Sequence, residues 1–251
     1  MDGAALHRAF DSLWWRLYGD LDGAVRERRG DLTLYLYPTM PIPQFNGAWV
    51  EEDSAAAVEA LPKAIADVEA AGAHAWVQTR SRQERARQAA LGLGLTYVER
   101  VPAMLARKDE FLQPPCEIEI EYVGEADFDE VTALAAGAFG LPDDVFALFN
   151  RLVWPLDGLS WYLGRAGGEI VSTSVGAVAD GAVGIFNVAT SPQHRGQGYG
   201  AALTARAARD GFDAGAEFAY LQSSELGHGV YRRLGFRDVE EYLLLTRPLA
   251  A

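Results

Sequence analysis

Apolar and polar positions alternate along this chain in two different rhythms, which together predict a mixed α/β fold. From Leu6 to Leu17 the apolar residues recur at helical spacing, which predicts an amphipathic helix over residues 5–18. Short apolar or alternating runs predict strands at residues 32–37, 47–50, 73–79, 97–106, 118–123, 161–165, 170–178, 182–189, 218–222 and 241–246. Helical patterns predict helices at residues 55–71, 81–91, 126–139, 143–153, 198–213 and 229–234.

The order of these predicted elements is similar in the two halves of the chain. Residues 73–106 run strand, helix, Leu-Gly-Leu and strand, while residues 218–246 run strand, helix, Leu-Gly-Phe and strand. Each half also has a strand and a helix upstream of this unit. We interpret the similarity as a divergent duplication, although any mixed α/β chain can show the same succession.

A charged segment that ends in adjacent prolines, residues 107–115, has the composition of an interdomain linker. It divides the sequence into two predicted domains, residues 1–110 and residues 116–251. The chain has 251 residues, of which 49% are apolar and 11% are aromatic. Either half is therefore long and apolar enough to bury a core of its own.

The charge balance limits the classes of partner. There are 22 basic and 35 acidic residues, and the resulting net charge of −13 repels phosphate backbones and anionic lipid headgroups. We expect no nucleic-acid partner, no membrane partner, and substrates that are cationic or neutral. A few oriented N–H groups can still attract one anionic cofactor at contact range.

Cys116 is the only cysteine, which excludes an intrachain disulfide and a thiolate-bound metal cluster held by this chain alone. His7 and His74 show no metal-ligand spacing, so we expect no metal cofactor. The sequence shows neither a signal peptide nor an apolar run of about eighteen residues. These features are typical of a soluble, cytoplasmic protein.

The segment from Asn187 to Leu203 leads from an apolar strand through a glycine-rich loop into a helix. The glycines alternate with other residues, at Gly196, Gly198 and Gly200. Because glycine permits positive φ and close backbone approach, consecutive N–H groups can point into one concavity beside the helix N-terminus. The loop therefore predicts a pyrophosphate cradle, to which Arg195 can add a charge-assisted contact.

The loop sequence also allows other interpretations. The glycines could serve only to turn the chain into the helix. A P-loop is excluded, because it needs Gly-Lys-Ser/Thr and neither Lys63 nor Lys108 follows a glycine. The spacing Gly196-x-Gly198-x-x-Ala201, with Glu217 as a ribose-binding acid, also matches the dinucleotide fingerprint of an oxidoreductase. Against that rival, residues 191–195 separate the first glycine from its strand.

Two motifs carry a resemblance to a known family. Arg195-x-x-Gly198-x-Gly200, after a strand that ends in Val-Ala-Thr-Ser-Pro, resembles the acetyl-CoA loop of the GNAT superfamily of N-acetyltransferases. The downstream segment 221–236, in which a strand ends in a polar residue and a short helix presents Tyr231 before Leu-Gly-Phe, resembles that superfamily's second cofactor segment. The close resemblance covers about residues 117–247. It implies a GNAT acyl-CoA N-acyltransferase fold, a mixed α/β sheet, in two tandem GNAT-like domains.

The resemblance also implies roles for single residues. The backbone of Val188, Ala189 and Thr190 would pair with the pantetheine arm as an added strand. The pyrophosphate would lie on the amides of Arg195, Gly196, Gln197, Gly198, Tyr199, Gly200 and Ala201. Ser224 would make a polar contact to the cofactor, Tyr231 would be the general acid for the departing CoA thiolate, and an N–H near Val188 would stabilise the oxyanion.

The activity implied is an acetyl-CoA-dependent N-acetyltransferase that acts on a primary amine of a small molecule or peptide by direct attack. Such a reaction needs no enzyme nucleophile, so Cys116 is assigned no role. Candidates for the base are Glu225, His228 and Glu169. A non-catalytic CoA-binding or scaffolding module of the same fold is the alternative. The acceptor, the acyl-chain preference and the oligomeric state, a homodimer included, stay open.

The N-terminal half departs from the cofactor pattern. Between Val50 and Ala55 it has Glu51-Glu52-Asp53 in place of a glycine series, and three carboxylates would repel a pyrophosphate. We therefore expect this half to bind no cofactor and to shape the acceptor cleft. Its tryptophans, Trp14, Trp15, Trp49 and Trp76, are interpreted as core or interface residues.

Overall fold

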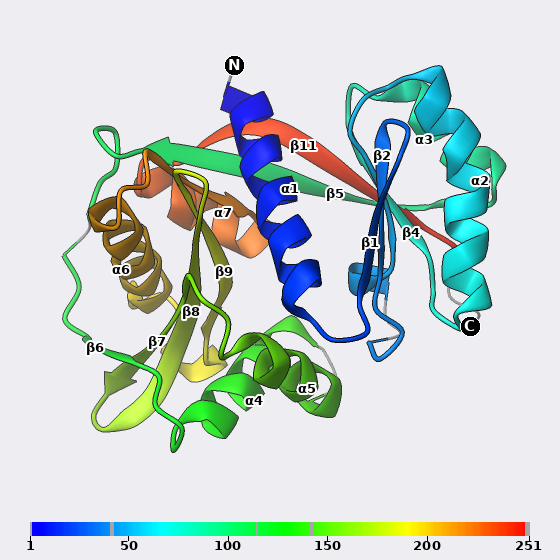
Figure 1. The fold of residues 1–251 in the computed structure, drawn as a ribbon. Helices are drawn as coiled ribbons and strands as arrows, with labels where there is room; N and C mark the ends of the chain where they lie inside the picture. Colours follow the sequence, from blue (N-terminus) through cyan, green and yellow to red (C-terminus); the bar gives the residue numbers. More distant parts are fainter. Residues whose placement is uncertain (1, 41–42, 114, 141–142, 249–251) are drawn as a thin grey trace. The chain divides into compact units, whose positions relative to one another are not determined.

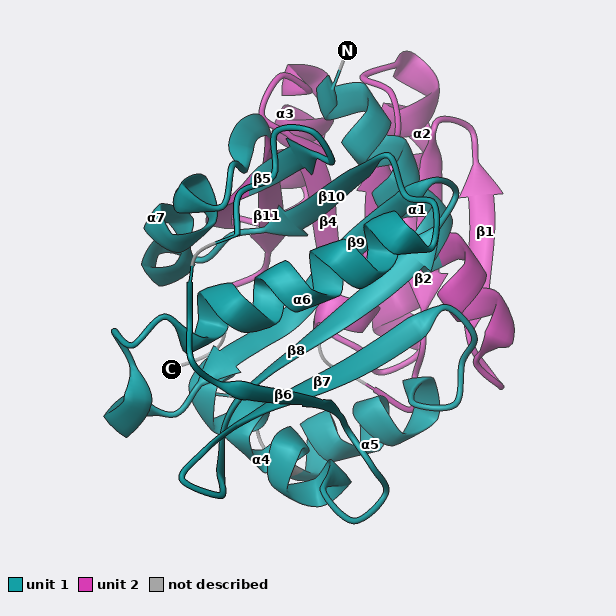
Figure 2. Ribbon diagram, turned by 90° about the vertical axis from the view of Figure 1, so that its left-hand side faces the viewer, with its two compact units in different colours: residues 1–14, 103–239 teal, residues 15–102, 240–251 magenta. Residues whose placement is uncertain are grey.

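The computed structural model describes residues 2–40, 43–113, 115–140 and 143–248 (Figure 1). The chain divides into two compact units, which Figure 2 colours separately. Unit 1 comprises Met1–Trp14 and Ala103–Val239, and unit 2 comprises Trp15–Pro102 and Glu240–Ala251. Each unit is therefore built from two separate stretches of sequence.

Unit 1 contains a six-stranded mixed sheet in the order β5-β10-β9-β8-β7-β6. Its strands are the second half of β5 (Tyr97–Arg107), β6 (Glu119–Tyr122), β7 (Leu159–Ala166), β8 (Glu169–Ala179), β9 (Ala182–Thr190) and β10 (Phe218–Gln222). Its helices are the first part of α1 (Asp2–Asp20), α4 (Phe128–Phe139), α5 (Asp143–Val153), α6 (Tyr199–Asp213) and α7 (Glu225–Arg233), with a 3-10 turn at Pro192–His194. Strands β9 and β10 run parallel, whereas β6 pairs with β7, β7 with β8 and β8 with β9 in antiparallel fashion.

Helix α6 packs along β8 and β9 on one face of this sheet, as Figure 2 shows. The core between α6 and the sheet contains small residues of α6 and apolar strand residues such as Val183, Ile185 and Leu221. The alternate strand residues face the other side, where α4 packs on β8 and β9, and Ala189 joins Phe146 of α5 in a second cluster. Residues of β9 therefore pack against α6 on one face of the sheet and against α4 and α5 on the other, as expected for a strand that is buried on both sides.

Unit 2 contains strands in the order β1-β2-β3-β4-β11. They are β1 (Val25–Arg29), β2 (Leu32–Leu36), β3 (Gly47–Val50), β4 (Trp76–Arg80) and the second half of β11 (Arg237–Thr246), with a 3-10 turn at Pro43–Phe45. Helices α2 (Ala55–Ala70) and α3 (Glu84–Gly92) bury their apolar stripes in a core with β2, β3, β4 and β11. Helix α2 continues through Pro62, as the apolar pattern predicts.

The final strands explain why the units differ from the predicted domains 1–110 and 116–251. Strand β5 follows α3 in the sequence but pairs with β10 of unit 1, from Ala103 opposite Gln222 to Arg107 opposite Phe218. Strand β11 follows α7 but pairs with β4 of unit 2. Residues 107–113 of the predicted linker thus belong to unit 1, and Pro114 lies outside the described residues. Pairing between strands that are far apart in the sequence cannot be detected from local amino-acid composition.

Most predicted elements are confirmed within a few residues, and the mixed α/β class is confirmed. The prediction missed β1, because Val-Arg-Glu-Arg-Arg has no apolar alternation and its residues are exposed or half-buried. Helix α7 begins at Glu225 rather than at residue 229. Among the described residues, no helix has both the length and the apolar character needed to cross a membrane.

Candidate active site

Strand β9 parts from β10 before either strand ends. Their parallel pairing stops at Gly184 opposite Tyr220, although β9 continues to Thr190 and β10 to Gln222. We call this divergence, between residues 185–190 of β9 and residues 221–222 of β10, the splay. It exposes a strand edge between two strands, and an extended ligand can hydrogen-bond to such an edge.

A β-bulge in β9 lies at the splay. On β8, Thr173 is opposite Ala189 and Val175 is opposite Phe186, so two residues of β9 face the single residue between them on β8. One of the two is Asn187, whose φ is +51°, a left-handed conformation that asparagine tolerates better than most residues. A bulge leaves backbone groups out of the ladder, so Asn187 and Val188 can turn an N–H toward a ligand. The sequence placed the oxyanion donor near Val188 but did not single out Asn187.

The glycine loop has the backbone conformation that a cradle needs. Gly196 and Gly198 have φ values of +80° and +87°. Gly198 is the N-cap of α6, so no side chain caps this helix, and the first intrahelical bond runs from the amide of Ala202 to the carbonyl of Gly198. Among the described residues, none accepts a hydrogen bond from the amides of residues 196–201. The helix dipole and these free donors favour an anion at this point.

The first turn of α6 lies close to the end of β9. A Cβ built on Gly200 would be 3.3 Å from Oγ1 of Thr190 and 3.7 Å from Cγ1 of Val188. The predicted pantetheine edge and the predicted pyrophosphate cradle are therefore adjacent. Arg195 is exposed beside them, with its Nε 3.3 Å from the Thr190 carbonyl oxygen. The residues present thus fit an extended ligand that carries an anionic group.

Cys116 lies beside the same loop. Its Sγ is 3.8 Å from the carbonyl oxygen of Gln197 and 3.7 Å from a Cβ built on Gly198. Burial and the neighbouring Glu117 raise the pKa of the thiol. A thiol of raised pKa is a poor nucleophile, which agrees with a site that uses no covalent intermediate on cysteine.

Tyr231 is buried on α7. Its side chain is 8% exposed, and the ring contacts Phe236 with centroids 6.1 Å apart. Gly227 makes room for this ring, because a Cβ there would be 2.7 Å from Cε2 of Tyr231. Burial raises the pKa of the phenol to about 12. The hydroxyl therefore keeps its proton at neutral pH and can donate it to a stronger base.

Three of the remaining predicted residues lie on α7 or at its N-terminus, and Glu169 lies on β8. Ser224 is the N-cap of α7, with its Oγ accepting a hydrogen bond from the amide of Gly227 at 3.2 Å. His228 is half-buried, with Nε2 2.8 Å from Oδ1 of Asp238. Glu225 is exposed in the first turn of α7, and Glu169 is exposed at the start of β8. Asp238 gives His228 a fixed orientation that neither glutamate has.

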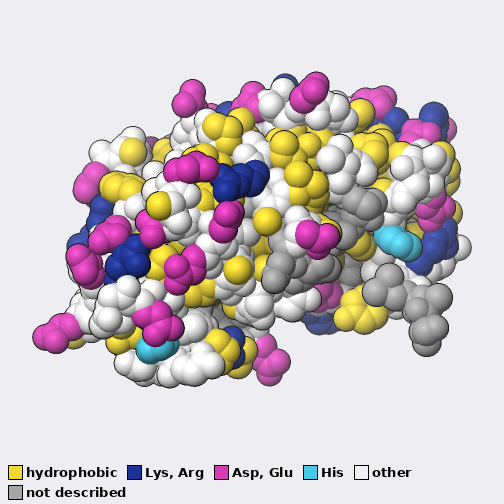
Figure 3. Space-filling view, turned by 90° about the horizontal axis from the view of Figure 1, so that it is seen from below, with side chains coloured by type: hydrophobic (Ala, Val, Ile, Leu, Met, Phe, Trp, Pro, Cys, Tyr) yellow, Lys and Arg dark blue, Asp and Glu magenta, His cyan; other side chains and the backbone are white. Residues whose placement is uncertain are grey.

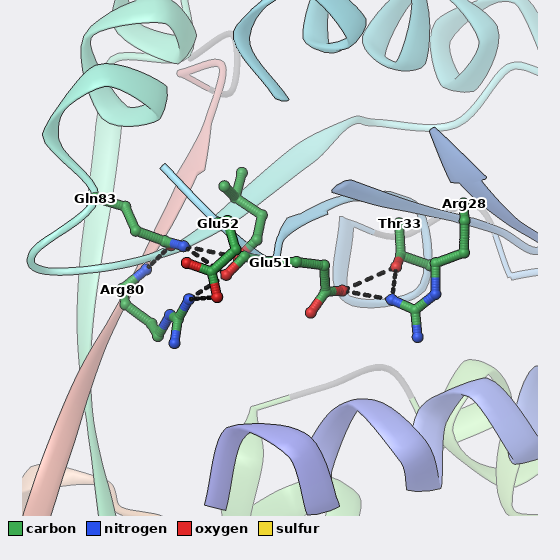
Figure 4. A network of polar contacts seen from close by, with 7 residues as sticks. Arg28, Thr33, Glu51, Glu52, Arg80 and Gln83 are labelled. Carbon is green, nitrogen blue, oxygen red and sulfur yellow. Dashed lines mark hydrogen bonds and ion pairs between the residues drawn. The ribbon is translucent and has the colours of Figure 1, made fainter. Parts of the chain in front are cut away.

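Unit 2 has a corresponding strand–loop–helix segment whose loop is occupied by its own side chains (Figure 4). After β3, Glu51 forms an ion pair with Arg28 at 2.7 Å and accepts a hydrogen bond from Thr33 at 2.9 Å. Glu52 lies 3.8 Å from the guanidinium of the buried Arg80. Carboxylates already paired with arginines take the place that an anionic ligand would need.

The helix N-termini of this unit are also satisfied internally. Ser54 caps α2, with its Oγ accepting from the amide of Ala57 at 3.1 Å. Asp53 accepts from the amides of Arg85 and Ala86 at the start of α3, at 3.2 and 2.9 Å. Where α6 presents uncapped amides next to glycine, α2 presents a side-chain cap next to carboxylates. The segment therefore lacks the donors on which the cradle of unit 1 depends.

Two of the tryptophans, Trp15 and Trp49, have partners within the protein. Trp49 is buried against Tyr35, with ring centroids 4.8 Å apart, as a core residue. Trp15 is flanked by the guanidinium groups of Arg26 and Arg28, each 4.7 Å from its ring centroid. Its aromatic face thus already has cationic partners. In the part of the chain that the structure describes, no cluster of His, Cys, Asp and Glu could hold a metal ion.

Comparison with known proteins agrees with this geometry. Residues 129–236 match the model of the Acetyltransferase (GNAT) family, a range that contains the splay, the glycine loop and Tyr231. Among solved structures, a GCN5-related N-acetyltransferase from Kribbella flavida is similar over 99% of this chain and 96% of its own, with 22% identity and a TM-score of 0.79. One from Sphaerobacter thermophilus is similar over 88% of this chain and 82% of its own, with 19% identity and a TM-score of 0.63. No curated protein sequence matches. At these identities the structures establish the fold, and the GNAT fold expected from the sequence is confirmed.

Proposed function

Because residues 129–236 match the model of the Acetyltransferase (GNAT) family, we propose that the protein transfers the acetyl group of acetyl-CoA to a primary amine of a small molecule or peptide. The observation that carries the proposal is the succession, within unit 1, of a splayed and bulged strand, a glycine loop with free amides, and a buried protonated tyrosine. These parts correspond to the three needs of acyl transfer from a thioester. They hold the cofactor, stabilise the oxyanion and protonate the leaving sulfur.

The loop and strand bind the cofactor in this proposal. The amides of residues 195–201 hold the pyrophosphate at the N-terminus of α6, and Arg195 adds a charged contact. The backbone of residues 188–190 pairs with the pantetheine arm along the splay. The bulge at Asn187 and Val188 turns an N–H toward the carbonyl oxygen of the thioester. Ser224 caps α7 beside this path and contributes a polar contact.

The chemical step needs no covalent intermediate on the enzyme. A neutral amine attacks the thioester carbonyl, a C–N bond forms, and the negative charge gathers on the oxygen. When the intermediate collapses, the C–S bond breaks and its electron pair leaves on sulfur, which takes a proton from Tyr231. The nitrogen loses its extra proton to a base, for which His228, oriented by Asp238, is the candidate to test first. The proton held by the base returns through solvent to Tyr231, so the net change from the ammonium form of the substrate is one amide, one CoA thiol and one proton released.

The distribution of charge on the surface supports a small or peptidic acceptor. On the face drawn in Figure 3, Lys and Arg side chains are interspersed with Asp and Glu and form no continuous basic patch of the kind that binds nucleic acid. The net charge of −13 favours a cationic substrate.

We propose that unit 2 is a degenerate GNAT-like half that binds no cofactor, because its loop carboxylates and helix N-termini are paired internally.

The first experiment is a thermal melt of the purified protein with acetyl-CoA, with NADH as the comparison ligand. At about 100 times its dissociation constant a ligand adds ~2.7 kcal/mol, which for a chain of this size raises the midpoint by about 5–10 °C. Stabilisation by acetyl-CoA alone supports the proposal, whereas stabilisation by NADH alone would support a dinucleotide-binding protein. Release of CoA thiol in proportion to an added amine then separates an enzyme from a CoA-binding module without turnover.

A further inference from the structure

Gln222 is the last residue of β10, and the strand register places it at the splay. Tyr220 lies opposite Gly184 in the last parallel pair, so Gln222, two residues further along, reaches the level of Phe186 on β9. Asn187 and the bulge follow Phe186 directly. The carboxamide of Gln222 is therefore attached where the strands part, beside the backbone that the proposed function assigns to the thioester carbonyl.

The side chain of Gln222 lies on the face of the sheet opposite α6. Leu221 belongs to the core under α6, while the ring of Tyr220 contacts Phe10 and Phe186, with centroids 6.2 and 6.3 Å apart. Because successive strand residues point to opposite faces, Gln222 shares the face of Tyr220. The glycine loop, at the N-terminus of α6, approaches from the other face. Gln222 is thus on the side left to the acceptor.

The carboxamide of Gln222 has no use within the protein that the structure shows. Its Nε2 is buried and finds no hydrogen-bond partner among the described residues. Its partner on β5 is Ala103, whose side chain is a methyl group, and the rings of Tyr220, Phe10 and Phe186 contact one another on the face of the sheet that Gln222 shares. Buried amide groups without partners are uncommon in proteins, and a functional contact is one of the reasons for keeping one. The residue as a whole is only partly buried, so part of it is accessible to a ligand.

We propose that Gln222 orients the attacking amine of the acceptor. This inference rests on the proposed acetyl transfer. Oε1 accepts a hydrogen bond from an amine N–H and directs the nitrogen lone pair toward the carbonyl carbon, while Nε2 donates to a polar atom of the acceptor. A carboxamide suits this task because it is neutral: a carboxylate in its place would stabilise the ammonium form, which has no lone pair to attack with. The aromatic rings of Tyr220, Phe10 and Phe186 on the same face favour an amine on an apolar or aromatic stem.

The test compares Gln222→Leu and Gln222→Glu with the wild type, and Gln113→Leu serves as the matched control. Gln113 is an exposed glutamine of unit 1 that accepts a hydrogen bond from Arg209, away from the splay. CoA thiol release is measured with phenethylamine, hexylamine and glycinamide as probe amines, and acetyl-CoA affinity is measured by calorimetry. Where no probe amine reacts, the slow hydrolysis of acetyl-CoA is compared instead, since water then takes the amine's place.

For Gln222→Leu we expect kcat/KM for the amine to fall about 10-fold or more, with unchanged acetyl-CoA affinity and an unchanged or higher Tm. For Gln222→Glu we expect the rise of kcat/KM with pH to shift to higher pH. Gln113→Leu should behave as the wild type in both respects. If Gln222 had only a structural role, substituting it would lower Tm and would leave the pH dependence of kcat/KM unchanged.

Unchanged amine kinetics in Gln222→Leu, or a loss shared equally by acetyl-CoA affinity, would overturn the inference. Failure of the proposed function looks different, because the wild type itself would then bind no acetyl-CoA. Acetyl-CoA binding without any thiol release, by amine or by water, would overturn both the transfer activity and the role of Gln222 and would leave the cofactor site standing.

Discussion

Tyr231→Phe removes one hydroxyl from the buried face of α7 and leaves the ring in place. The contacts with Phe236 and Gly227 are made by ring atoms, and no described residue hydrogen-bonds the hydroxyl. The substitution should therefore change stability by less than about 0.5 kcal/mol and Tm by less than about 2 °C. Any effect on turnover is then a chemical one.

The expected loss is about 10²-fold in the rate of acetyl transfer. At neutral pH the raised pKa of Tyr231, about 12, keeps its hydroxyl fully protonated, and the same burial makes a thiolate released nearby more basic. General acid catalysis contributes at least about 10²-fold, or roughly 2.7 kcal/mol of transition-state stabilisation. The affinity for acetyl-CoA should not change, because the phenol is needed only when the C–S bond breaks.

The assay is single-turnover transfer, with CoA thiol release followed after mixing the acetyl-CoA complex with excess amine, so that slow product release does not hide the chemical step. In the wild type the rate should not fall at high pH until well above the ordinary tyrosine pKa of about 10. A single-turnover rate within about twofold of the wild type, at unchanged acetyl-CoA affinity, would refute the role of Tyr231.

The same pKa has a consequence for stability. Because the folded pKa lies above the unfolded one, the protonated phenol is favoured by folding, and its contribution is complete below about pH 10 and lost as pH rises through about 12. Unfolding by urea at pH 9 and at pH 11.5 should therefore show a smaller alkaline loss of stability in Tyr231→Phe than in the wild type. Equal losses would show that the phenol is not buried as described.

Three further substitutions test other parts of the structure. Gly198→Asp should weaken acetyl-CoA binding by about 100-fold or more in calorimetry, through a strained φ of +87° and a carboxylate in the cradle, whereas Gly167→Asp, with a φ of +61° in the β7–β8 turn, should bind normally. Gly211→Ala should destabilise unit 1 by about 1–3 kcal/mol in urea unfolding, because its Cβ would overlap Cβ of Val183, and an unchanged midpoint would contradict that packing. Ser54→Ala should cost about 1 kcal/mol of stability through the lost α2 cap and leave a stoichiometry of one acetyl-CoA per chain, while a second bound acetyl-CoA would show that unit 2 is a cofactor site.

The sequence determined the elements and the chemistry that is local to them. The periods of 3.6 and 2 are set by backbone geometry, so helices such as α6 and strands such as β9 could be placed within a few residues. The glycine loop could be recognised because positive φ at Gly196 and Gly198 is a property of the residue type. The prediction that no cradle follows β3 rests on residue type alone, because carboxylates repel a pyrophosphate wherever they are folded.

Only the tertiary structure decided which segments meet. Strand β5 pairs with β10 of unit 1, and β11 pairs with β4 of unit 2, through backbone hydrogen bonds. Because these bonds are the same for every side-chain type, the local sequence does not indicate which strands pair. The bulge at Asn187 is a difference in register between two strands and is defined only when β8 and β9 are paired. Gln222 is an ordinary polar strand end in the sequence. It becomes a candidate for acceptor recognition because folding places it on the face that carries the Tyr220 and Phe186 rings, at the point where two strands part, and leaves its Nε2 without a partner among the described residues.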